Sequence, residues 1–308
     1  MGGRVLVGPE TGDDAGVYAF GEKALVATAD FITPVGDDPF RFGRVAAANS
    51  LSDVYAMGGR PLFALNLCCF PEEVPKEALA GILSGAADAL AEAGAVLLGG
   101  HSVRDPELKF GLAVIGEADP NRLLPNTGAQ AGQRLILTKP LGTGVLVNAF
   151  KADKIGEAEL EPALVEMSRL NAEAGRLALL HGATAATDIT GFGLAGHAWN
   201  IARGSNLALR FQFERLPLHD GFLRLTKEGV TTGCTELNEE NVRGHWHDRA
   251  NLDRIRRAIL FDPQTSGGLL ICVPAASAEA LLEDLLAGGH KAAEVGEVLE
   301  GAAGIEVV

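Results

Sequence analysis

Residues 42–59 read Phe-Gly-Arg-Val-Ala-Ala-Ala-Asn-Ser-Leu-Ser-Asp-Val-Tyr-Ala-Met-Gly-Gly, and this stretch predicts the helix around which the chain is organised. Apolar side chains recur near the helical period and two glycines predict the end of the helix; these residues are Val45, Ala48, Leu51, Tyr55, Gly58 and Gly59. Asn49 and Asp53 are four residues apart, so they project from the same helix face. A carboxylate and an amide on a face of small residues suit a hydrated magnesium ion and its phosphate ligand, although a surface or capping aspartate gives the same pattern.

The composition indicates an acidic globular protein of one large or two medium-sized domains, and two is the better expectation. The chain has 308 residues, a formal net charge of −14 and a pI near 4.9. A nucleic-acid-binding surface needs a basic stripe, so we expect no nucleic-acid partner and no binding to an anionic membrane. If the ligand is a polyphosphate, carboxylates can hold it only through bridging divalent cations.

The cysteines and the apolar runs indicate a cytoplasmic protein. The four cysteines lack the spacing of metal ligands, and two of them are adjacent in an apolar run: Cys68, Cys69, Cys234 and Cys272. This pattern favours buried thiols in a reducing compartment. The sequence contains no apolar run of membrane-spanning length and no basic-then-apolar leader.

Acidic residues stand where predicted strands or loops end. Asp13 and Asp14 close a turn-rich loop after the first predicted strand, and Asp30 ends the hairpin that follows. Asp188 ends a later predicted strand and precedes a glycine-rich turn. A solvated acidic turn explains one such residue well, but the whole set favours a metal site.

Two glycine-rich segments invite comparison with phosphate-binding loops. A buried strand predicted at 95–98 runs into Gly99-Gly100-His101-Ser102, which predicts a turn whose backbone N–H groups can approach phosphate. His101 by itself is more often a hydrogen-bonded structural residue. The segment Lys139-Pro-Leu-Gly-Thr-Gly144 lacks the spacing of a Walker motif, so it does not predict a P-loop.

Residues 117–132 contain several prolines and glycines with little periodicity, which predicts a domain boundary near residue 118. The chain is thereby divided into an N-terminal domain, residues 1–117, and a C-terminal domain, residues 118–308. The second half is expected to include a long helix over residues 161–180. Strands, helices and glycine turns alternate in both halves, which predicts two α+β domains with a ligand between them or on the first.

Several motifs, taken together and in order, resemble the selenophosphate synthetase (selenide, water dikinase) family over essentially the whole chain. They are Gly-Gly-His-Ser (99–102), Leu-Thr-Lys-Pro-Leu-Gly-Thr-Gly (137–144), Asp-Ile-Thr-Gly-Phe-Gly-Leu-Ala-Gly-His (188–197) and Asp-Pro-Gln-Thr-Ser-Gly-Gly-Leu-Leu (262–270). The helix at 49–59 is similar to a wider superfamily. That superfamily includes aminoimidazole ribonucleotide synthetase, thiamine-monophosphate kinase and a hydrogenase-maturation protein.

The resemblance implies a reaction and a set of ligand-binding residues. ATP, selenide and water would be converted to selenophosphate, AMP and phosphate. The magnesium ligands would be Asp14, Asp53 and Asp188. Asp53 would bridge metal and nucleotide, and the other ATP contacts would be Thr11, Gly12, Asp13, Asp30, Gly100, His101 and Ser102.

The resemblance also implies an architecture like that of aminoimidazole ribonucleotide synthetase, in which each of two domains is a mixed sheet packed with helices. The N-terminal domain would bind ATP and Mg²⁺ and would pair in a homodimer, with the nucleotide site near the interface. The physics agrees, because phosphoryl transfer needs charge neutralisation and positioning more than covalent chemistry from the protein. Carboxylates from separate elements can hold Mg²⁺ ions that bridge phosphate oxygens.

One departure from the family concerns its reactive residues. The family carries a glycine-rich segment with a reactive cysteine or selenocysteine and a nearby lysine upstream of the first acidic loop, and this sequence has no such segment. No catalytic residue is therefore assigned, and we expect a retained metal scaffold with impaired selenium chemistry. Two alternatives stay open: an ATP-dependent ligase or kinase of the same superfamily, and a non-catalytic nucleotide-binding subunit.

Overall fold

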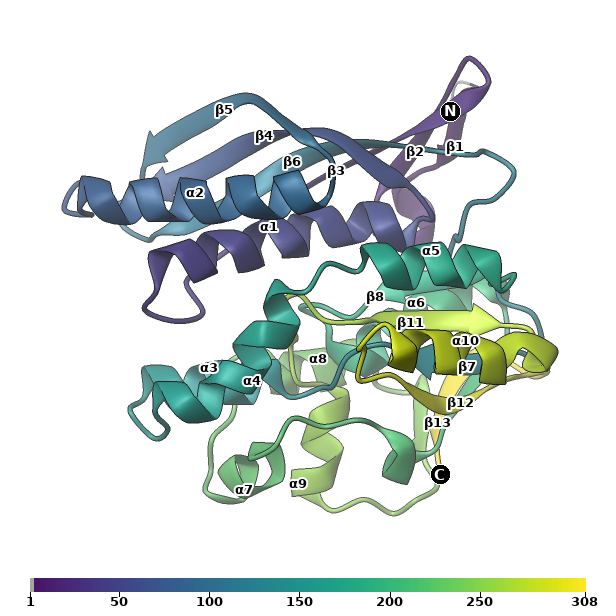
Figure 1. Ribbon diagram of the computed structural model, residues 1–308. Coiled ribbons are helices and arrows are strands. Elements are labelled where there is room, and N and C mark those ends of the chain that lie inside the picture. Colours follow the sequence, from purple (N-terminus) through teal and green to yellow (C-terminus); the bar gives the residue numbers. More distant parts are fainter. Residues whose placement is uncertain (1–2) are drawn as a thin grey trace.

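The computed structural model describes residues 3–308, which form two sheets that lie one above the other with helices between and around them (Figure 1). Within these residues the first sheet has six strands in the order β1 (Val5–Val7), β2 (Gly16–Phe20), β3 (Lys23–Ile32), β6 (Lys109–Ala118), β4 (Arg60–Phe70) and β5 (Val96–Arg104). The β4–β5 pair is parallel and the others are antiparallel, so the sheet is mixed. Helices α1 (Pro39–Ala56) and α2 (Lys76–Glu92) cover one of its faces.

Helix α1 confirms the helix expected over 42–59, although it begins three residues earlier. Asp38 caps its first turn by accepting a hydrogen bond from the backbone N–H of Phe40 at 2.9 Å. The helix ends at Ala56, and Gly58 follows with a φ of +77°, which glycine adopts readily. Every residue from 45 to 56 is buried, because α1 contacts the first sheet and α2 on one side and the second domain on the other. The contacting elements of the second domain are α4 (Glu157–Ser168), α5 (Ala172–Leu180) and β8 (Ala185–Asp188).

Glycines let α1 and α2 cross with their backbones in contact. A Cβ atom added at Gly43 would lie 1.9 Å from the carbonyl oxygen of Ile82, and one added at Gly85 would lie 1.8 Å from that of Phe40. Real Cβ atoms cannot approach a carbonyl oxygen so closely, so any side chain larger than hydrogen would push the helices apart.

Replacing Gly85 with alanine is therefore expected to destabilise the protein by about 3 kcal/mol, since overpacking of a closely packed site forces backbone shifts. Denaturant unfolding followed by circular dichroism measures this change. The matched control is Gly233→Ala, at a position where an added Cβ meets nothing within 4 Å. Equal stability of the two variants would contradict the close packing of α1 on α2.

The second sheet lies beneath α1 and is also mixed. In the described part of the chain it has seven strands in the order β10 (Trp246–Asp248), β13 (Gly304–Val307), β9 (Ala208–Phe211), β12 (Ala293–Leu299), β7 (Arg134–Leu137), β11 (Leu269–Val273) and β8 (Ala185–Asp188). β13 runs parallel to β10 and β9, and the remaining pairs are antiparallel.

Helices cover both faces of the second sheet. Ile136 packs in one core cluster with residues of α5 (Ala172–Leu180) and α10 (Ala275–Ala287). Its neighbours Leu135 and Leu137 pack in another cluster with α3 (Thr143–Lys151), α4 (Glu157–Ser168) and α6 (Gly193–Ser205), as the alternation of side chains along a strand requires. The short helices α7 (Phe222–Lys227), α8 (Thr235–Asn241) and α9 (Arg254–Arg257) complete the domain. Two mixed sheets packed with helices confirm the predicted α+β organisation.

Two local predictions are wrong. The helix expected over 161–180 is interrupted between Ser168 and Ala172, where the side chain of Asn171 donates hydrogen bonds to Ser52 Oγ and to the carbonyl oxygen of Gly267. The turn expected at 99–102 is instead part of β5. Gly100 pairs with Asn66 of β4, and a Cβ atom there would lie 2.3 Å from the Asn66 carbonyl oxygen.

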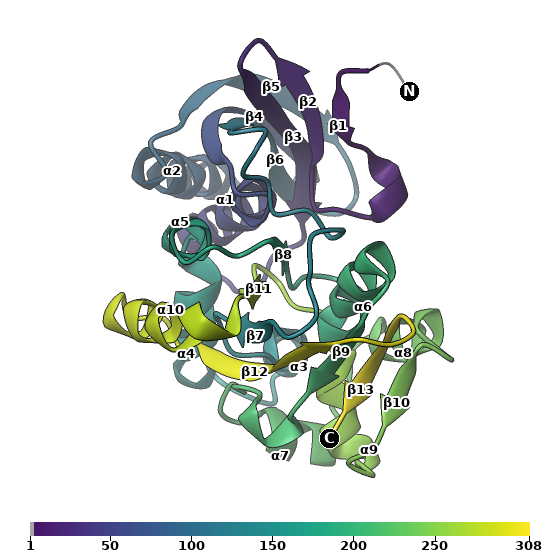
Figure 2. The same cartoon turned by 90° about the vertical axis from the view of Figure 1, so that its right-hand side faces the viewer.

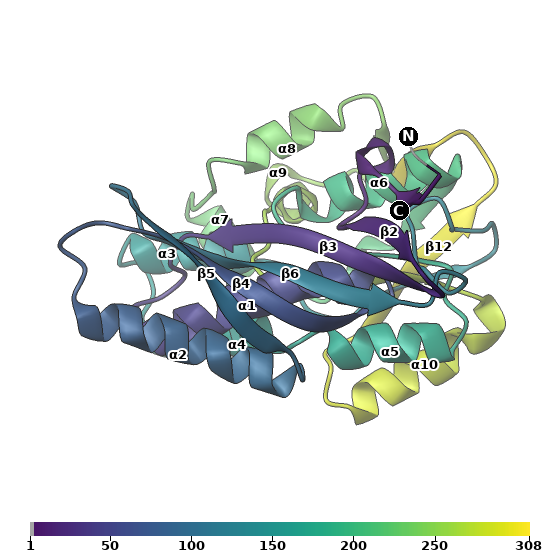
Figure 3. The same ribbon diagram turned by 90° about the horizontal axis from the view of Figure 1, so that it is seen from above.

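Within residues 3–308, helices cover one face of the first sheet only, and Figure 3 shows the other face uncovered. Phe31 and Leu65 project from that face with 52% and 38% of their surface exposed, and His101 shares it by strand register. Strand β5 is exposed along its whole length.

Among the described residues, no helix has both the length and the apolar character that are needed to cross a bilayer.

Candidate metal and nucleotide site

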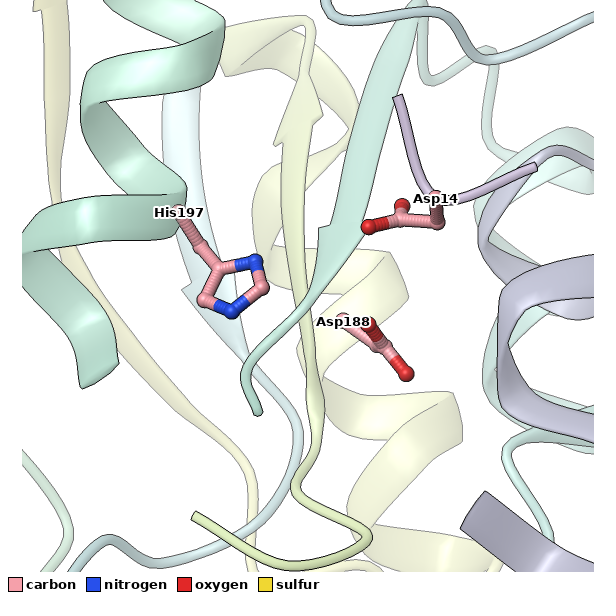
Figure 4. A group of neighbouring side chains, drawn as sticks. All are labelled: Asp14, Asp188 and His197. Atoms are coloured by element: carbon pink, nitrogen blue, oxygen red, sulfur yellow. The ribbon is translucent and has the colours of Figure 1, made fainter. Parts of the chain in front are cut away.

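Three acidic residues from separate elements meet where the two domains join. Asp14 lies in the loop before β2, Asp53 on α1 and Asp188 at the end of β8. Ligand atoms of Asp14, Asp188 and His197 all lie within 4.8 Å of one another (Figure 4). Asp53 is close enough that the charges of both other carboxylates act on its pKa. The structure thus brings together the three residues predicted to hold magnesium.

Two carboxylate oxygens at this junction lack a partner. Asp14 Oδ2 and Asp188 Oδ2 are buried, and no group from residue 3 to residue 308 donates a hydrogen bond to either. Buried polar atoms are rarely left unsatisfied, so these oxygens are suited to an additional ligand. Because they are hard, anionic oxygens, they fit a cation such as Mg²⁺.

The electrostatics of the three carboxylates also favour a cation. Burial raises the pKa of Asp14 well above its usual range, and the charge of Asp188 raises it further. The pKa of Asp53 is raised in the same way, by burial first and then by Asp188 and Asp14. Burial raises the pKa of Asp188 to about 6. A divalent cation would relieve this repulsion and keep all three groups ionised.

The side chain of Asn49 forms hydrogen bonds with Asp30 and with the second domain. Its Nδ2 donates a hydrogen bond to Asp30 Oδ2, and its Oδ1 accepts one from the backbone N–H of Ser266 at 2.9 Å. The amide is therefore fixed in one orientation. Asp30, whose pKa is raised by burial, borders a cleft of about 620 Å³ between the domains that is also lined by Thr190 and Gln264.

The loop that precedes Asp14 is held by the second half of the chain. Asp13 accepts hydrogen bonds from the Thr11 hydroxyl and, at 2.6 Å, from the backbone N–H of Asn126. The carbonyl oxygen of Gly12 accepts from the side chains of Asn126 at 2.9 Å and Asn200 at 3.2 Å. Figure 2 shows this loop directly above α6. These contacts position Asp14 at the domain junction.

Gly100, His101 and Ser102 lie away from this group within one chain. Strand register places Gly100 opposite Asn66, Asn66 opposite Leu112, and Leu112 opposite Asp30. Three strand spacings separate Gly100 from Asp30, which is about 14 Å. The structure therefore does not bring this predicted part of the nucleotide site to the acidic residues of the same chain.

The N-terminus of α3, after Lys139, is already satisfied by side chains. The backbone N–H groups of Gly142 and Thr143 donate to Gln264 Oε1, and that of Gly144 donates to Asp262 Oδ2. This agrees with the absence of a P-loop from the sequence. Lys139 itself is buried and donates to two backbone carbonyls, and burial lowers its pKa to about 7.

Sequence reasoning missed residues that hold the carboxylates in place. Thr28 donates a hydrogen bond to Asp53, and Thr187 donates one to Asp14 at 2.8 Å. His197 lies behind Thr187 and joins Asp14 and Asp188 in space. Only His197 had a sequence signal, as the last residue of the motif at 188–197.

Comparison with known proteins assigns both domains. Residues 12–118 match the model for the AIR synthase related protein, N-terminal domain, and residues 130–308 match that for the C-terminal domain. A solved thiamine-monophosphate kinase from Stenotrophomonas maltophilia superposes with a TM-score of 0.72 at 22% identity, covering 99% of this chain and 92% of that one. The solved structure of the hydrogenase maturation protein HypE in complex with ATP superposes with a TM-score of 0.69 at 18% identity, covering 98% of this chain and 88% of that one. These similarities confirm the predicted aminoimidazole ribonucleotide synthetase-like fold.

Two curated relatives share more of the sequence. The selenide, water dikinase of Geobacter metallireducens is 49% identical over 302 residues, which cover 96% of this chain and 87% of that protein. The selenide, water dikinase of Myxococcus xanthus is 45% identical over 311 residues, which cover 100% of this chain and 88% of that protein. The chain therefore belongs to the selenide, water dikinase family of AIR synthase related proteins.

Proposed function

We propose that this protein is a selenide, water dikinase, which uses ATP, selenide and water to form selenophosphate, AMP and phosphate. Its relatives from Geobacter and Myxococcus carry that name. The structural observation that carries the proposal is that Asp14, Asp53 and Asp188 lie together at the domain junction. Two of their buried oxygens, Asp14 Oδ2 and Asp188 Oδ2, have no hydrogen-bond partner among residues 3–308. A group of this kind can neutralise the charge that phosphoryl transfer concentrates on phosphate oxygens.

We propose Asp14, Asp53 and Asp188 as ligands of Mg²⁺. Magnesium bound by carboxylates neutralises phosphate charge and orients the reacting phosphoryl group. The protein's part is to hold the carboxylates in place at the junction of its domains. Thr28 does so for Asp53 and Thr187 for Asp14, through hydrogen bonds to one oxygen of each.

We propose that ATP is contacted by Asp53 and by two further groups of residues, one from each of two chains. The loop Thr11, Gly12 and Asp13 adjoins Asp14, and Asp30 borders the cleft between the domains. The second group is Gly100, His101 and Ser102. Because Gly100 lies about 14 Å from Asp30 across the sheet and the other two follow it on β5, the proposal assigns all three to the nucleotide site of a second chain.

A homodimer through the first sheet accounts for this division. The uncovered face of the sheet and the exposed strand β5 carry large apolar side chains, including Phe31, Leu65, Val96, Leu98 and Val103. An exposed edge strand and a contiguous apolar face are both features that a partner ordinarily covers. A second copy on this face would bury these side chains and carry His101 towards its neighbour.

We propose that residues 1–117 form the ATP- and Mg²⁺-binding and dimerisation domain and that residues 118–308 form the second α+β domain. Asp188 belongs to the second domain, so the proposed metal site needs both. We also propose a cytoplasmic location. Each of the four cysteines is a free thiol in the described part of the chain, and Cys68 and Cys69 are adjacent without being joined, which suits a reducing compartment.

The test of the function is ATP consumption with Mg²⁺, with and without selenide, followed by ³¹P NMR of the products. A parallel chain carries upstream the glycine-rich segment with cysteine or selenocysteine and lysine that the family resemblance implies. Selenide-dependent formation of selenophosphate and AMP by either chain supports the proposal. If neither chain responds to selenide, the protein is a ligase or kinase with another substrate, or a nucleotide-binding subunit.

Replacing Asp53 with asparagine is expected to abolish Mg²⁺-dependent nucleotide binding and to leave the fold intact, because it removes a charge that joins metal and nucleotide. Calorimetric titration with a non-hydrolysable ATP analogue measures this, with circular dichroism as the check on folding. The control is His247→Ala, an exposed residue on β10 in the second sheet, which should bind like the original chain. Unchanged affinity in the Asp53 variant would remove Asp53 from the site.

A further inference from the structure

A chain of hydrogen bonds joins the glycine-rich turn after β8 to Asp14. The backbone N–H of Thr190 donates to His197 Nε2 at 3.1 Å, and the Thr190 hydroxyl lies 3.1 Å from the same nitrogen. On the other side of the ring, His197 Nδ1 lies 3.4 Å from Thr187 Oγ1. Thr187 Oγ1 in turn lies 2.8 Å from Asp14 Oδ1. Figure 4 shows the imidazole and the two carboxylates of Asp14 and Asp188 grouped together.

The donors and acceptors allow only one direction for this series of hydrogen bonds. A backbone N–H can only donate, so Nε2 must accept, and a neutral imidazole then carries its proton on Nδ1. That N–H faces Thr187 Oγ1, which accepts a hydrogen bond from it and can donate a hydrogen bond of its own. The carboxylate of Asp14 at 2.8 Å is a closer and stronger acceptor than the Asp188 carbonyl oxygen at 3.3 Å. Burial lowers the pKa of His197 to about 4, so the imidazole is neutral at pH 7.

We propose that His197 is a positioning residue for Asp14: its Nδ1–H orients the Thr187 hydroxyl, which holds Asp14 Oδ1 and leaves Oδ2 free for a cation. The proposal rests on the proposed function, in which Asp14 is a metal ligand. It assigns His197 no direct contact with the cation. Both ring nitrogens are already engaged, and Mg²⁺ prefers oxygen ligands to imidazole.

The proton position can be measured in the metal-free full chain by ¹⁵N NMR of labelled histidine. The signal of His197 is identified by its disappearance in His197→Gln. We expect a neutral ring with the proton on Nδ1 at pH 7. A proton on Nε2, or a doubly protonated ring at that pH, would overturn the proposal without any reference to metal or activity.

The effect on the metal site is measured with Mn²⁺ as a probe of affinity by titration calorimetry. Thr187→Val and His197→Gln are expected to weaken Mn²⁺ binding 10- to 100-fold, the usual loss when a residue supporting a ligand is removed. Glutamine keeps an acceptor near the Nε2 position, whereas asparagine can keep a donor near the Nδ1 position. His197→Asn and Thr187→Ser should therefore stay within about threefold of the original chain.

A double variant separates one chain of bonds from two independent effects. Thr187→Val combined with His197→Gln is expected to lose no more Mn²⁺ affinity than Thr187→Val alone, because His197 acts only through Thr187. Additive losses would overturn the proposal. So would ¹⁴N hyperfine coupling to bound Mn²⁺ that disappears in His197→Gln, since it would make His197 a direct ligand.

The same titrations distinguish failure of the proposal from failure of the proposed function. If the original chain binds Mn²⁺ and His197→Gln binds it equally well, only the role of His197 is wrong. If the original chain binds no Mn²⁺ and Asp53→Asn changes nothing, the metal site itself is wrong and the proposal is lost with it.

Discussion

Replacing Asp188 with asparagine is expected to raise the thermal stability of the metal-free protein and to abolish its response to Mg²⁺. Asp188 is almost fully buried, and burial raises its pKa from 3.8 to about 6. Keeping this carboxylate ionised in the folded protein at pH 8 costs on the order of 2–3 kcal/mol. Asparagine removes that cost and with it one of the negative charges proposed to bind the cation.

The direction of the pH dependence follows from the raised pKa. Well below pH 3.8, Asp188 is protonated in both the folded and the unfolded chain, so it imposes no penalty. Between about pH 4 and pH 6 the unfolded chain gives up this proton while burial keeps it on the folded protein, so the metal-free protein loses stability across that range, and the loss is complete above about pH 6. Scanning calorimetry at pH 5 and pH 8, with and without Mg²⁺, should show this loss in the original chain and a smaller loss in Asp188→Asn.

The same variant should lose at least about a thousandfold in turnover, because metal-supplied charge stabilisation is worth several kcal/mol. Asp37→Asn, which changes an exposed carboxylate, is the control and should resemble the original chain in stability and in its Mg²⁺ response. Stabilisation of Asp188→Asn by Mg²⁺ to the same extent as the original chain would exclude Asp188 from the metal site.

Replacing Leu65 with glutamate is expected to convert the proposed homodimer to monomers and to weaken nucleotide binding more than tenfold. Leu65 lies on β4 in the uncovered face of the first sheet, with 38% of its surface exposed in the single chain. An exposed position in a monomer tolerates glutamate with little cost, whereas a charge buried in an apolar interface costs several kcal/mol. Nucleotide affinity should fall as well, because the proposal assigns His101 to the site of a second chain.

Sedimentation equilibrium gives the oligomeric state, and circular dichroism checks that the variant folds. The matched control is Leu286→Glu, a leucine on α10 in the second domain that is 51% exposed. A monomeric original chain would contradict the proposed dimer directly. A Leu65→Glu variant that remains dimeric would place the interface on another surface.

Much of the first domain could be predicted from local sequence signals. Helix α1 was predictable because its apolar period and its terminal glycines are properties of neighbouring residues. The acidic residues Asp14, Asp53 and Asp188 could be singled out from their positions in the sequence. Asp14 closes a turn-rich loop, Asp188 ends a predicted strand, and Asp53 lies on a helix face of small residues. The family motifs then pointed to the same three residues.

Long-range contacts decided the local structures that were predicted wrongly. Residues 161–180 have a helical pattern, but the helix is interrupted at Asn171, whose side chain bonds Ser52 and Gly267 across the domain junction. The glycine pair before His101 favours a turn locally, yet pairing with β4 makes Gly100 part of strand β5. In each case the partner lies far along the sequence, so no local pattern contains it.

The sequence by itself determined which residues carry charge and which elements present them, since helix period, glycine stops and acidic strand ends depend on near neighbours. Only the tertiary structure decided what those residues contact. It brings Thr187 and His197 behind Asp14, sets Asn49 between Asp30 and Ser266, and separates Gly100 from Asp30 by three strands. The physical reason is that hydrogen bonds and pKa shifts depend on distance and burial, and both are settled when the two sheets close on α1.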